Sequence, residues 1–258
     1  MKYYEDKCSI LYQDDAFNFM KRIPNNAVDV IVADPPYFLS NDGFSNSGGK
    51  FVSVNKGKWD KLPSKDIEKF YAEMLSQFQR ILNKNGTAWI FGSMHNIYVI
   101  GYLLNRYDFK ILNNITWQKS NPAPNLSRRM FTHSTETILW IKKKDGKQFF
   151  NYDLMRKLNG NKQMKDVWTT ATINKSEKRF GNHPTQKPLS IIMRIIKAST
   201  TDGMIVLDPF IGAGTTAVAG KLCGVKVVGV DNSAGYLNIA VQRLKDYQNE
   251  RIGKIKWI

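Results

Sequence analysis

The sequence predicts an α/β fold with a mostly parallel sheet, because three short apolar runs each end at an acid and helical patterns separate them. The run 28–33 is rich in β-branched residues and leads into Asp34. Two later runs, 204–207 and 225–230, lead into Asp208 and Asp231. Continuous apolar runs of this length are typical of parallel strands buried on both faces. In such sheets ligands bind at the carboxyl edge of the strands.

Size and composition limit the function classes. The 258 residues suffice for one large α/β domain, or for a domain with a sizeable insertion. The net charge of +16 and the pI near 9.7 favour a polyanionic partner, nucleic acid before membrane. A ribosome-associated protein and simple solubility are the alternatives. Cys8 and Cys223 form neither a metal-binding spacing nor a disulfide framework, so we expect a reduced cytoplasmic setting and no metal. Neither a signal peptide nor a membrane span is expected.

In the first part of the chain, strand and helix patterns alternate. The residues after Tyr37 are rich in Gly, Ser and Asn, and they predict a long mobile loop at 38–58 that could close over a ligand. Ser64 is expected to cap the helix that follows, and Gly86 to mark a turn. Strands are predicted at 9–13, 28–33, 87–91, 109–117 and 137–141, and helices at 16–23, 64–82 and 96–106.

The stretch from Lys119 to Lys187 is irregular and basic. Between Trp117 and Lys187 there are 15 Lys and Arg against 5 Asp and Glu. Such residues neutralise phosphates, and interleaved aromatic residues can stack on bases or fill a gap in a base stack. A solvated charged face is the ordinary alternative, but the concentration of charge favours nucleic acid. The basic residues predicted to bind DNA are Arg128, Arg129, Lys142, Lys143 and Lys144, and the interleaved aromatics are Phe131, Phe149, Phe150, Tyr152, Trp168 and Phe180.

Regular α/β order returns near the end of the chain. A helix is predicted at 189–198, and a second helix opens after the turn at 208–216 and runs to about 222. Ser233 is expected to cap a final helix that reaches about 248.

The tetrad Asp34-Pro35-Pro36-Tyr37 is the first candidate site. Two prolines cannot continue a central strand, so the strand stops at Asp34. The Asp34 carboxylate and the Pro35 carbonyl are hydrogen-bond acceptors, and Tyr37 supplies a flat face for stacking. This set suits a planar group that carries an amine, such as a nucleobase. Taken alone, the tetrad is equally consistent with a Pro-Pro turn that carries a surface acid.

The second candidate site is the turn Asp208-Pro209-Phe210-Ile211-Gly212-Ala213-Gly214-Thr215-Thr216. Its glycines let a ligand approach the backbone at a helix N-terminus. Asp231, at the end of the next strand, is well placed to hold a ribose diol. A lone Gly-x-Gly is weak evidence for a nucleotide site, and an ordinary dinucleotide-binding fold could also show it. Here, however, Asp208 precedes the glycines, and the complete Gly-x-Gly-x-x-Gly pattern of dinucleotide-binding folds is absent. That disfavours NAD and favours a nucleoside with a positively charged substituent.

Together the two motifs resemble the amino-methyltransferases of DNA in their β-class, circularly permuted order. Further similar segments are Asp15 at the first strand tip, 58–60, and the run His183-Pro184-Thr185-Gln186-Lys187-Pro188. The segments 38–41, 121–127 and 131–137 are most similar to the accessory adenine methyltransferases of DpnII-type GATC restriction–modification systems. The resemblance covers nearly the whole chain.

This resemblance implies a Rossmann-like methyltransferase fold, with a seven-stranded, mostly parallel sheet in which one strand is reversed. The strands that end at Asp208 and Asp34 would be neighbours. Residues 1–118 would form the catalytic half, 119–182 a basic target-recognition insertion that includes a core strand near 137–141, and 183–258 the cofactor-binding half. The implied cofactor is S-adenosylmethionine, and the residues implied to bind it are Asp15, Asp34, Thr185, Lys187, Asp208, Phe210, Gly212, Gly214, Thr215 and Asp231.

The implied reaction is methylation of an exocyclic amine of adenine in GATC, catalysed by Asp34, Pro35, Pro36 and Tyr37. The partner is DNA, and a homodimer is possible. Asp at the head of the tetrad, where enzymes that methylate the amine of cytosine usually carry Ser, favours adenine. The alternatives are a cytosine amino-methyltransferase, an RNA or protein amino-methyltransferase, and a nucleic-acid-binding protein that has lost catalysis.

Overall fold

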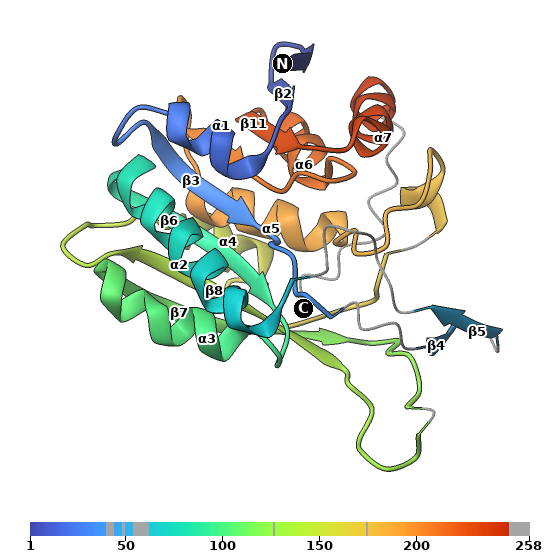
Figure 1. The fold of residues 1–258 in the computed structure, drawn as a ribbon. Coiled ribbons are helices and arrows are strands. Elements are labelled where there is room, and N and C mark those ends of the chain that lie inside the picture. Colours follow the sequence, from blue (N-terminus) through green and yellow to red (C-terminus); the bar gives the residue numbers. More distant parts are fainter. Residues whose placement is uncertain (40–43, 48–49, 54–61, 126, 174, 248–258) are drawn as a thin grey trace.

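The computed structural model describes residues 1–39, 44–47, 50–53, 62–125, 127–173 and 175–247. Its main feature is a nine-stranded sheet with the order β1-β2-β11-β10-β3-β6-β8-β7-β9 (Figure 1). The strands are β1 (Lys2–Glu5), β2 (Ser9–Gln13), β3 (Val28–Ala33), β6 (Leu82–Gly92), β7 (Phe109–Lys119), β8 (Thr135–Lys143), β9 (Val167–Thr170), β10 (Ile205–Asp208) and β11 (Lys226–Asp231).

The seven strands from β2 to β7 in this order confirm the predicted sheet. All are parallel except β8, which is antiparallel to both of its neighbours, β6 and β7. The outer strands β1 and β9 were missed. Both are only four residues long, and neither has the buried apolar run that identifies the central strands.

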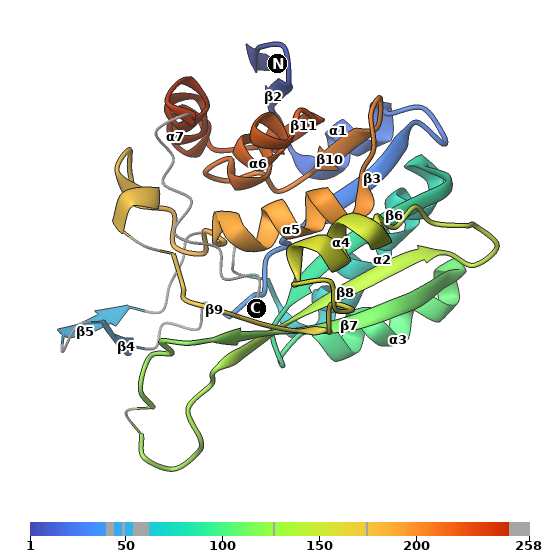
Figure 2. The ribbon, with the colours of Figure 1, turned by 180° about the vertical axis from the view of Figure 1, so that it is seen from behind.

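Helices cover both faces of the sheet (Figures 1 and 2). The strand β3 serves both layers, because Val30 and Val32 pack toward one layer while Ile31 and Ala33 pack toward the other. The first layer holds α5 (Leu189–Ser199), α6 (Thr215–Cys223) and α7 (Ala234–Lys245), with α4 (Tyr152–Leu158) against α5. The second layer holds α1 (Ala16–Arg22), α2 (Ser64–Ile81) and α3 (Ile97–Leu104). Apart from these layers, the chain has two short 3-10 helices among the described residues, η2 (Asn105–Tyr107) and η3 (Lys175–Lys178). None of the helices described is long and apolar enough to span a membrane.

Several local predictions need correction. Helix α2 begins at Ser64 with Pro63 in the capping position, so the capping role predicted for Ser64 was wrong. Gly86 lies inside the continuous strand β6, whereas a turn was expected there. Helix α4 was not predicted in the basic segment. The cap predicted at Ser233 is confirmed, because its hydroxyl oxygen accepts a hydrogen bond from the Tyr236 N–H.

The segment predicted as a long loop contains a small antiparallel hairpin, β4 (Phe44–Ser47) with β5 (Lys50–Ser53). This pairing was not expected, because Gly, Ser and Asn are unfavourable in strands. The remainder of the predicted loop at 40–43, 48–49 and 54–58 lies outside the described residues. The prediction that this loop closes over a ligand therefore stays a prediction.

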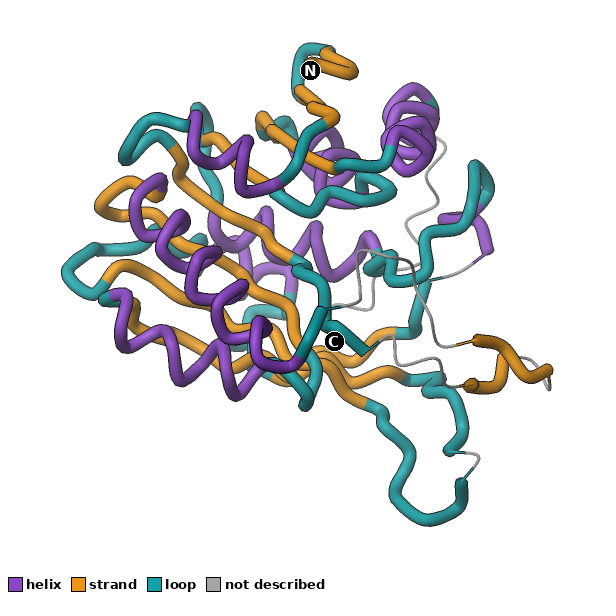
Figure 3. The backbone as a smooth tube through the Cα atoms, in the orientation of Figure 1, coloured by secondary structure: helices purple, strands orange, loops and turns teal. Residues whose placement is uncertain are grey.

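The parallel neighbours β10 and β3 are the part of the fold that matters most for the site. Val206 pairs with Val30 and Leu207 with Ile31, which confirms the predicted adjacency of these two strands. The chain leaves β10 toward β11 on one side and leaves β3 toward β6 on the other. The two strands therefore flank the topological switch point of the sheet, where α/β folds bind ligands. The backbone trace in Figure 3 shows helices around the central strands.

Candidate active site

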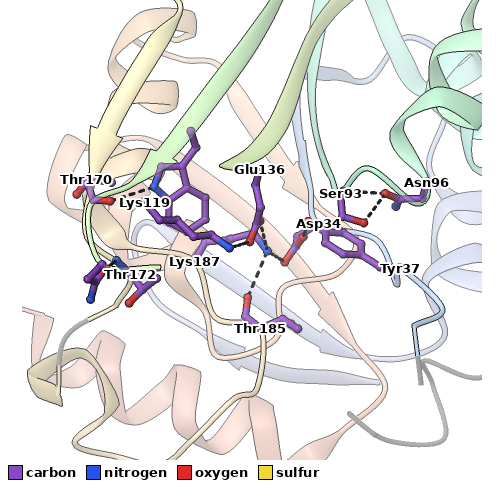
Figure 4. Close-up of polar contacts among 12 residues, drawn as sticks. Asp34, Tyr37, Ser93, Asn96, Lys119, Glu136, Thr170, Thr172, Thr185 and Lys187 are labelled. Carbon is purple, nitrogen blue, oxygen red and sulfur yellow. Dashed lines mark hydrogen bonds and ion pairs between the residues drawn. The ribbon is translucent and has the colours of Figure 1, made fainter. Parts of the chain in front are cut away.

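Asp34 follows the last residue of β3, and both of its carboxylate oxygens are engaged (Figure 4). The Tyr37 hydroxyl donates to Oδ1 over 2.9 Å, and the Lys187 ammonium lies 2.6 Å from Oδ2. Burial raises the pKa of Asp34 above its ordinary value, although Lys187 opposes this shift. A carboxylate has about four acceptor positions, so each oxygen can still accept another donor.

The turn after Asp34 is held from the side of α2 and α3. The Tyr71 hydroxyl donates to the Pro36 carbonyl over 2.7 Å and accepts from the Asn96 amide over 2.9 Å. The Asn96 side-chain oxygen in turn accepts from the Ser93 N–H over 2.8 Å. Within the described part of the chain no group donates to the Pro35 carbonyl. The turn is thus held at the Pro36 carbonyl, and the Pro35 carbonyl oxygen can accept a hydrogen bond from a ligand.

A row of alternating charges extends from Asp34 toward the basic segment, as Figure 4 shows. Lys187 also lies 3.7 Å from Glu136 at the start of β8, and Glu136 lies 2.7 Å from Lys119 at the end of β7. Burial would lower the pKa of Lys187, but Asp34 and Glu136 together raise it. Lys187 therefore remains charged.

Neither Lys119 nor Glu136 was predicted as a site residue. The available signal was a pair of opposite charges at the facing ends of two strands, but that pairing becomes visible only when β7 and β8 are known to be antiparallel neighbours.

Tyr37 contributes its hydroxyl to the site as well as its ring. Burial and the nearby Asp34 carboxylate hold the pKa of Tyr37 well above its ordinary value, so the hydroxyl remains a donor. Its ring centroid lies 5.3 Å from the Lys187 ammonium. The sequence predicted only a stacking face, and stacking on a base stays a prediction.

The glycine-rich turn is built around two acids. Asp208 is buried and accepts from the Phe210 N–H over 3.0 Å and from the Thr216 hydroxyl over 2.5 Å. Burial, with further contributions from neighbouring carboxylates, raises its pKa to about 7. The carboxylate of Asp231 accepts from the Gly212 N–H over 3.1 Å and from the Ser233 N–H over 2.8 Å. Asp208 in the turn and Asp231 at the end of β11 thus both accept hydrogen bonds from backbone N–H groups.

Gly212 and Gly214 have different roles in this turn. Both adopt positive φ, +50° and +78°, which favours glycine. A Cβ on Gly212 would lie 2.9 Å from the His183 ring beside the site, whereas a Cβ on Gly214 would lie 2.5 Å from the Ala240 side chain. Gly214 thus permits α6 to pack on α7. Thr215 is also partly structural, since its hydroxyl accepts from Arg243.

A cavity of about 280 Å³ opens beside these groups, close to the lower end of the roughly 300–1,000 Å³ range of small-molecule sites. Five predicted cofactor residues line it: Asp15, Asp34, Thr185, Phe210 and Asp231. A second cavity of about 40 Å³ is lined by Asp34, Thr185 and Phe210 together with Lys187, Asp208, Gly212 and Thr215. Of the predicted cofactor residues, only Gly214 lines neither cavity.

The larger cavity also has walls that were not predicted. Phe17 and Phe70 meet edge to face with centroids 5.0 Å apart, and Phe70 lies 6.4 Å from Phe210. Burial and the nearby Lys187 lower the pKa of His183, another lining residue, to about 4, so this imidazole is neutral at pH 7. Asp15 also caps helix α1, because its Oδ1 accepts a hydrogen bond from the Asn18 N–H over 2.9 Å. The cavity thus combines an aromatic wall with carboxylates, which suits a nucleoside.

The predicted DNA-binding residues form two separate groups. Arg128 and Arg129 are exposed on the segment between β7 and β8. Lys119 and Glu136 lie at the ends of these strands from which this segment extends. The second group, Lys142 to Lys144, lies at the other end of β8 and just beyond it. Eight residues at ~3.3 Å each place that end about 26 Å from the start of β8. The ammonium of Lys142 donates to the Lys144 carbonyl, and that of Lys143 to Asn26. The structure does not bring this second group together with Asp34.

Comparison with known proteins identifies the family. Residues 28–242 match the family described as DNA methylase. The chain belongs to this family. It is 53% identical over 246 residues to the type II methyltransferase M2.DpnII of Streptococcus pneumoniae, which covers 94% of this chain and 92% of the relative. It is 54% identical over 245 residues to M2.LlaDCHI of Lactococcus lactis subsp. cremoris, with 94% and 91% covered.

Among solved structures, the complex of M1.HpyAVI with SAM is similar, with a TM-score of 0.68 and 27% identity, covering 92% of this chain and 98% of that one. The family and the fold give this DNA methylase its reaction: it transfers a methyl group from S-adenosylmethionine to DNA. The predictions of a DNA methyltransferase and of its cofactor are confirmed.

Proposed function

We propose that this DNA methylase modifies the exocyclic amine of adenine within GATC, as the modification enzyme of a restriction–modification system. The observation that carries this proposal is the Asp34 carboxylate, which follows β3 at the switch point and lines the cavity. The next residue is Pro35, and within the described part of the chain no group donates to its carbonyl. An amine has two N–H donors, and these two acceptors match them. The similarity to M2.DpnII and M2.LlaDCHI supports GATC as the target.

The tetrad would act on the amine nitrogen. The lone pair of this nitrogen is delocalised into the ring, which makes it a poor nucleophile. Hydrogen bonds to the Asp34 carboxylate and the Pro35 carbonyl draw the nitrogen toward tetrahedral geometry, so that its lone pair points away from both acceptors. Pro36 fixes the turn, and the ring of Tyr37 stacks on the extruded base. When bound, S-adenosylmethionine supplies an electrophilic methyl group on a sulfonium.

The cavity fits this cofactor by the chemistry of its walls. Asp231 would accept hydrogen bonds from the two ribose hydroxyls, and Asp15 would accept one from the adenine amine. The aromatic wall of Phe17, Phe70 and Phe210 provides an apolar surface for a purine ring. The methionine part would lie against the turn from Phe210 to Gly214, with Asp208, Thr185 and Lys187 nearby.

The three-part division of the chain is part of the proposal. Residues 1–118 would supply the target-base pocket, 119–182 the contacts with DNA, and 183–258 the cofactor turn. Arg128 and Arg129 would contact the DNA backbone, and Lys142, Lys143 and Lys144 would extend this contact. We further propose that the enzyme acts in the cytoplasm, where its two free cysteines stay reduced, and that it forms a homodimer, which light scattering would measure.

The test is mass spectrometry of nucleosides from methylated oligonucleotides, with Asp34→Ala as the inactive control. We expect N6-methyladenine in oligonucleotides that contain GATC and none in matched oligonucleotides with GTAC. Single-stranded GATC should be accepted at least as readily as weakly paired duplex, because extrusion from a duplex costs a few kcal/mol. Methylcytosine as the main product would overturn adenine as the target base. Methyladenine outside GATC would overturn only the recognition sequence, and preferential methylation of RNA would overturn DNA as the substrate.

A further inference from the structure

Phe131 is the most exposed of the large apolar side chains in the described part of the chain. Its side chain is 96% exposed, and the adjacent Met130 is 60% exposed. They lie on the arm, defined here as residues 120–125 and 127–134, which connects β7 to β8 and projects from the body of the molecule in both views (Figures 1 and 2). A single exposed apolar residue needs no explanation, but an almost fully exposed ring on a projecting arm, next to a second exposed apolar residue, indicates a partner surface.

The base of the arm is part of the active site. Lys119 ends β7 and Glu136 lies one residue into β8, and both belong to the row of charges that ends at Asp34. The Lys119 N–H also donates to the Ser134 carbonyl over 2.7 Å, which closes the stem of the arm. Phe131 comes five residues before Glu136, so its reach from this stem is at most about 17 Å. At ~3.4 Å per base pair, that is about five base pairs of duplex.

The surroundings of Phe131 favour DNA as the partner. Arg128 and Arg129 precede it and are exposed, and the segment from Trp117 to Lys187 has ten more basic than acidic residues. The Asn125 side chain accepts from the Ser127 N–H over 2.9 Å and from its hydroxyl over 2.6 Å, and the hydroxyl oxygen of Ser127 accepts from the Arg129 N–H over 3.3 Å. These hydrogen bonds hold the arm locally, close in sequence to Phe131. A second copy of a chain with net charge +16 would bring two arginine pairs together, which disfavours self-association through the arm.

We infer that Phe131 is a positioning residue that inserts its ring into the base stack of duplex DNA and stabilises the form in which the target adenine is extruded. Apolar wedges between base steps unstack DNA and are used in this way when flanking cations hold the backbone. This inference rests on the proposed function, because it assumes an extruded target base. It assigns Phe131 to duplex substrates only, since a single strand has no stack to open.

The experiment compares kcat/KM on three GATC substrates: a duplex, a duplex with an abasic site opposite the target adenine, and a single strand. Phe131→Ala should lower kcat/KM on the duplex about tenfold or more, and leave the other two within about twofold. Phe131→Trp, which keeps a large ring, should restore the duplex rate. Ile111→Ala, an exposed apolar residue at the far end of β7, is the matched control and should leave all three unchanged.

A second readout separates extrusion from folding and binding. With 2-aminopurine in place of the target adenine, the rise in fluorescence on binding should be smaller for Phe131→Ala than for the wild type at saturating protein. Equal losses on duplex and single strand, or no loss on either, would overturn the inference. The inference would also be overturned if Phe131→Ala converted a dimer to a monomer and lost activity on every substrate, because Phe131 would then act in dimerisation. Failure of the proposed function has a different result, because the wild type would then methylate adenine in none of the three substrates.

Discussion

The Lys187 ammonium lies 2.6 Å from the Asp34 carboxylate, although the two residues are 153 positions apart in the chain. Lys187 is only 7% exposed and Asp34 21% exposed, so each would be costly to bury without the other. The contact joins the end of β3 to the segment before α5. It therefore links the predicted catalytic half, 1–118, to the predicted cofactor-binding half, 183–258. Lys187 opposes the rise that burial causes in the pKa of Asp34 and so favours the ionised carboxylate, the form that the proposed reaction requires.

Replacing Lys187 by Met should change the pH dependence of methyl transfer. Burial already raises the pKa of Asp34, and loss of the opposing ammonium raises it further. A smaller fraction of Asp34 is then ionised at a given pH, so the acidic limb of kcat against pH should move to higher pH. If the limb moves by one pH unit, the ammonium stabilises the ionised carboxylate by about 1.4 kcal/mol.

The control for this variant is Lys221→Met. Lys221 lies 2.7 Å from Asp6 in an ion pair that is partly exposed and lies outside the residues that line the site. It should leave the pH profile unchanged while removing a comparable ion pair. An unchanged acidic limb in Lys187→Met would mean that Lys187 does not govern the ionisation of Asp34.

The strands that contain a continuous apolar run could be predicted from the sequence, whereas the short outer strands β1 and β9, which lack such a run, were missed. The run 28–33 is apolar except for Asp29, and two prolines follow Asp34, so both the strand and its end at Asp34 could be predicted. The adjacency of Asp34 and Asp208 required the family resemblance, because no local pattern gives strand order. The contacts of Lys187 with Asp34 and Glu136 bring together three distant segments, and the sequence carries no short-range trace of them.

Removal of the Asp231 carboxylate should weaken S-adenosylmethionine binding. If Asp231 holds the ribose, each lost charged hydrogen bond is worth roughly 1.5–3 kcal/mol. Because its two oxygens also accept from Gly212 and Ser233, Asp231→Ala should additionally loosen the turn. Asp231→Asn retains one acceptor oxygen and is the milder variant. Calorimetry on folded protein measures both, and an unchanged dissociation constant in Asp231→Ala would show that the ribose is held elsewhere.

The two groups of basic residues should differ in their effect on DNA binding. Each phosphate contact contributes about 0.9 to the slope of log affinity against log salt concentration, so Arg128→Ala with Arg129→Ala should flatten this slope by about 1.8. The triple change of Lys142, Lys143 and Lys144 to Ala should flatten it less, because this group lies at the opposite end of β8 from the site. A binding series over salt concentration compares the two. Equal flattening by both variants would mean that DNA also crosses the far edge of the sheet, and no effect of either would make both groups a solvated face.

Asp208 should couple cofactor binding to pH. Its pKa is raised from 3.8 to about 7, chiefly by burial and further by Asp34 and Asp231. The unfolded chain ionises this group near 3.8, so the folded protein binds its proton more tightly. This contribution to stability is complete below about pH 3.8 and is lost progressively as pH rises to about 7. A bound sulfonium favours the ionised carboxylate and lowers the pKa of Asp208. Affinity for S-adenosylmethionine should therefore rise with pH up to about 7 and then level off.

The size of this effect follows from the ionised fraction of Asp208. Between pH 6 and pH 8 that fraction rises about tenfold for a group with a pKa of about 7, so this group contributes up to about 1.4 kcal/mol of binding free energy across the range. Titration calorimetry at several pH values, in two buffers of different ionisation enthalpy, measures both the affinity and the proton released. His183, with a pKa of about 4, does not titrate in this range. Asp208→Asn should bind more weakly and lose the pH dependence that Asp208 contributes, while retaining that of the cofactor's own amino group. Parallel curves for the wild type and Asp208→Asn would exclude Asp208 as the group that links binding to pH.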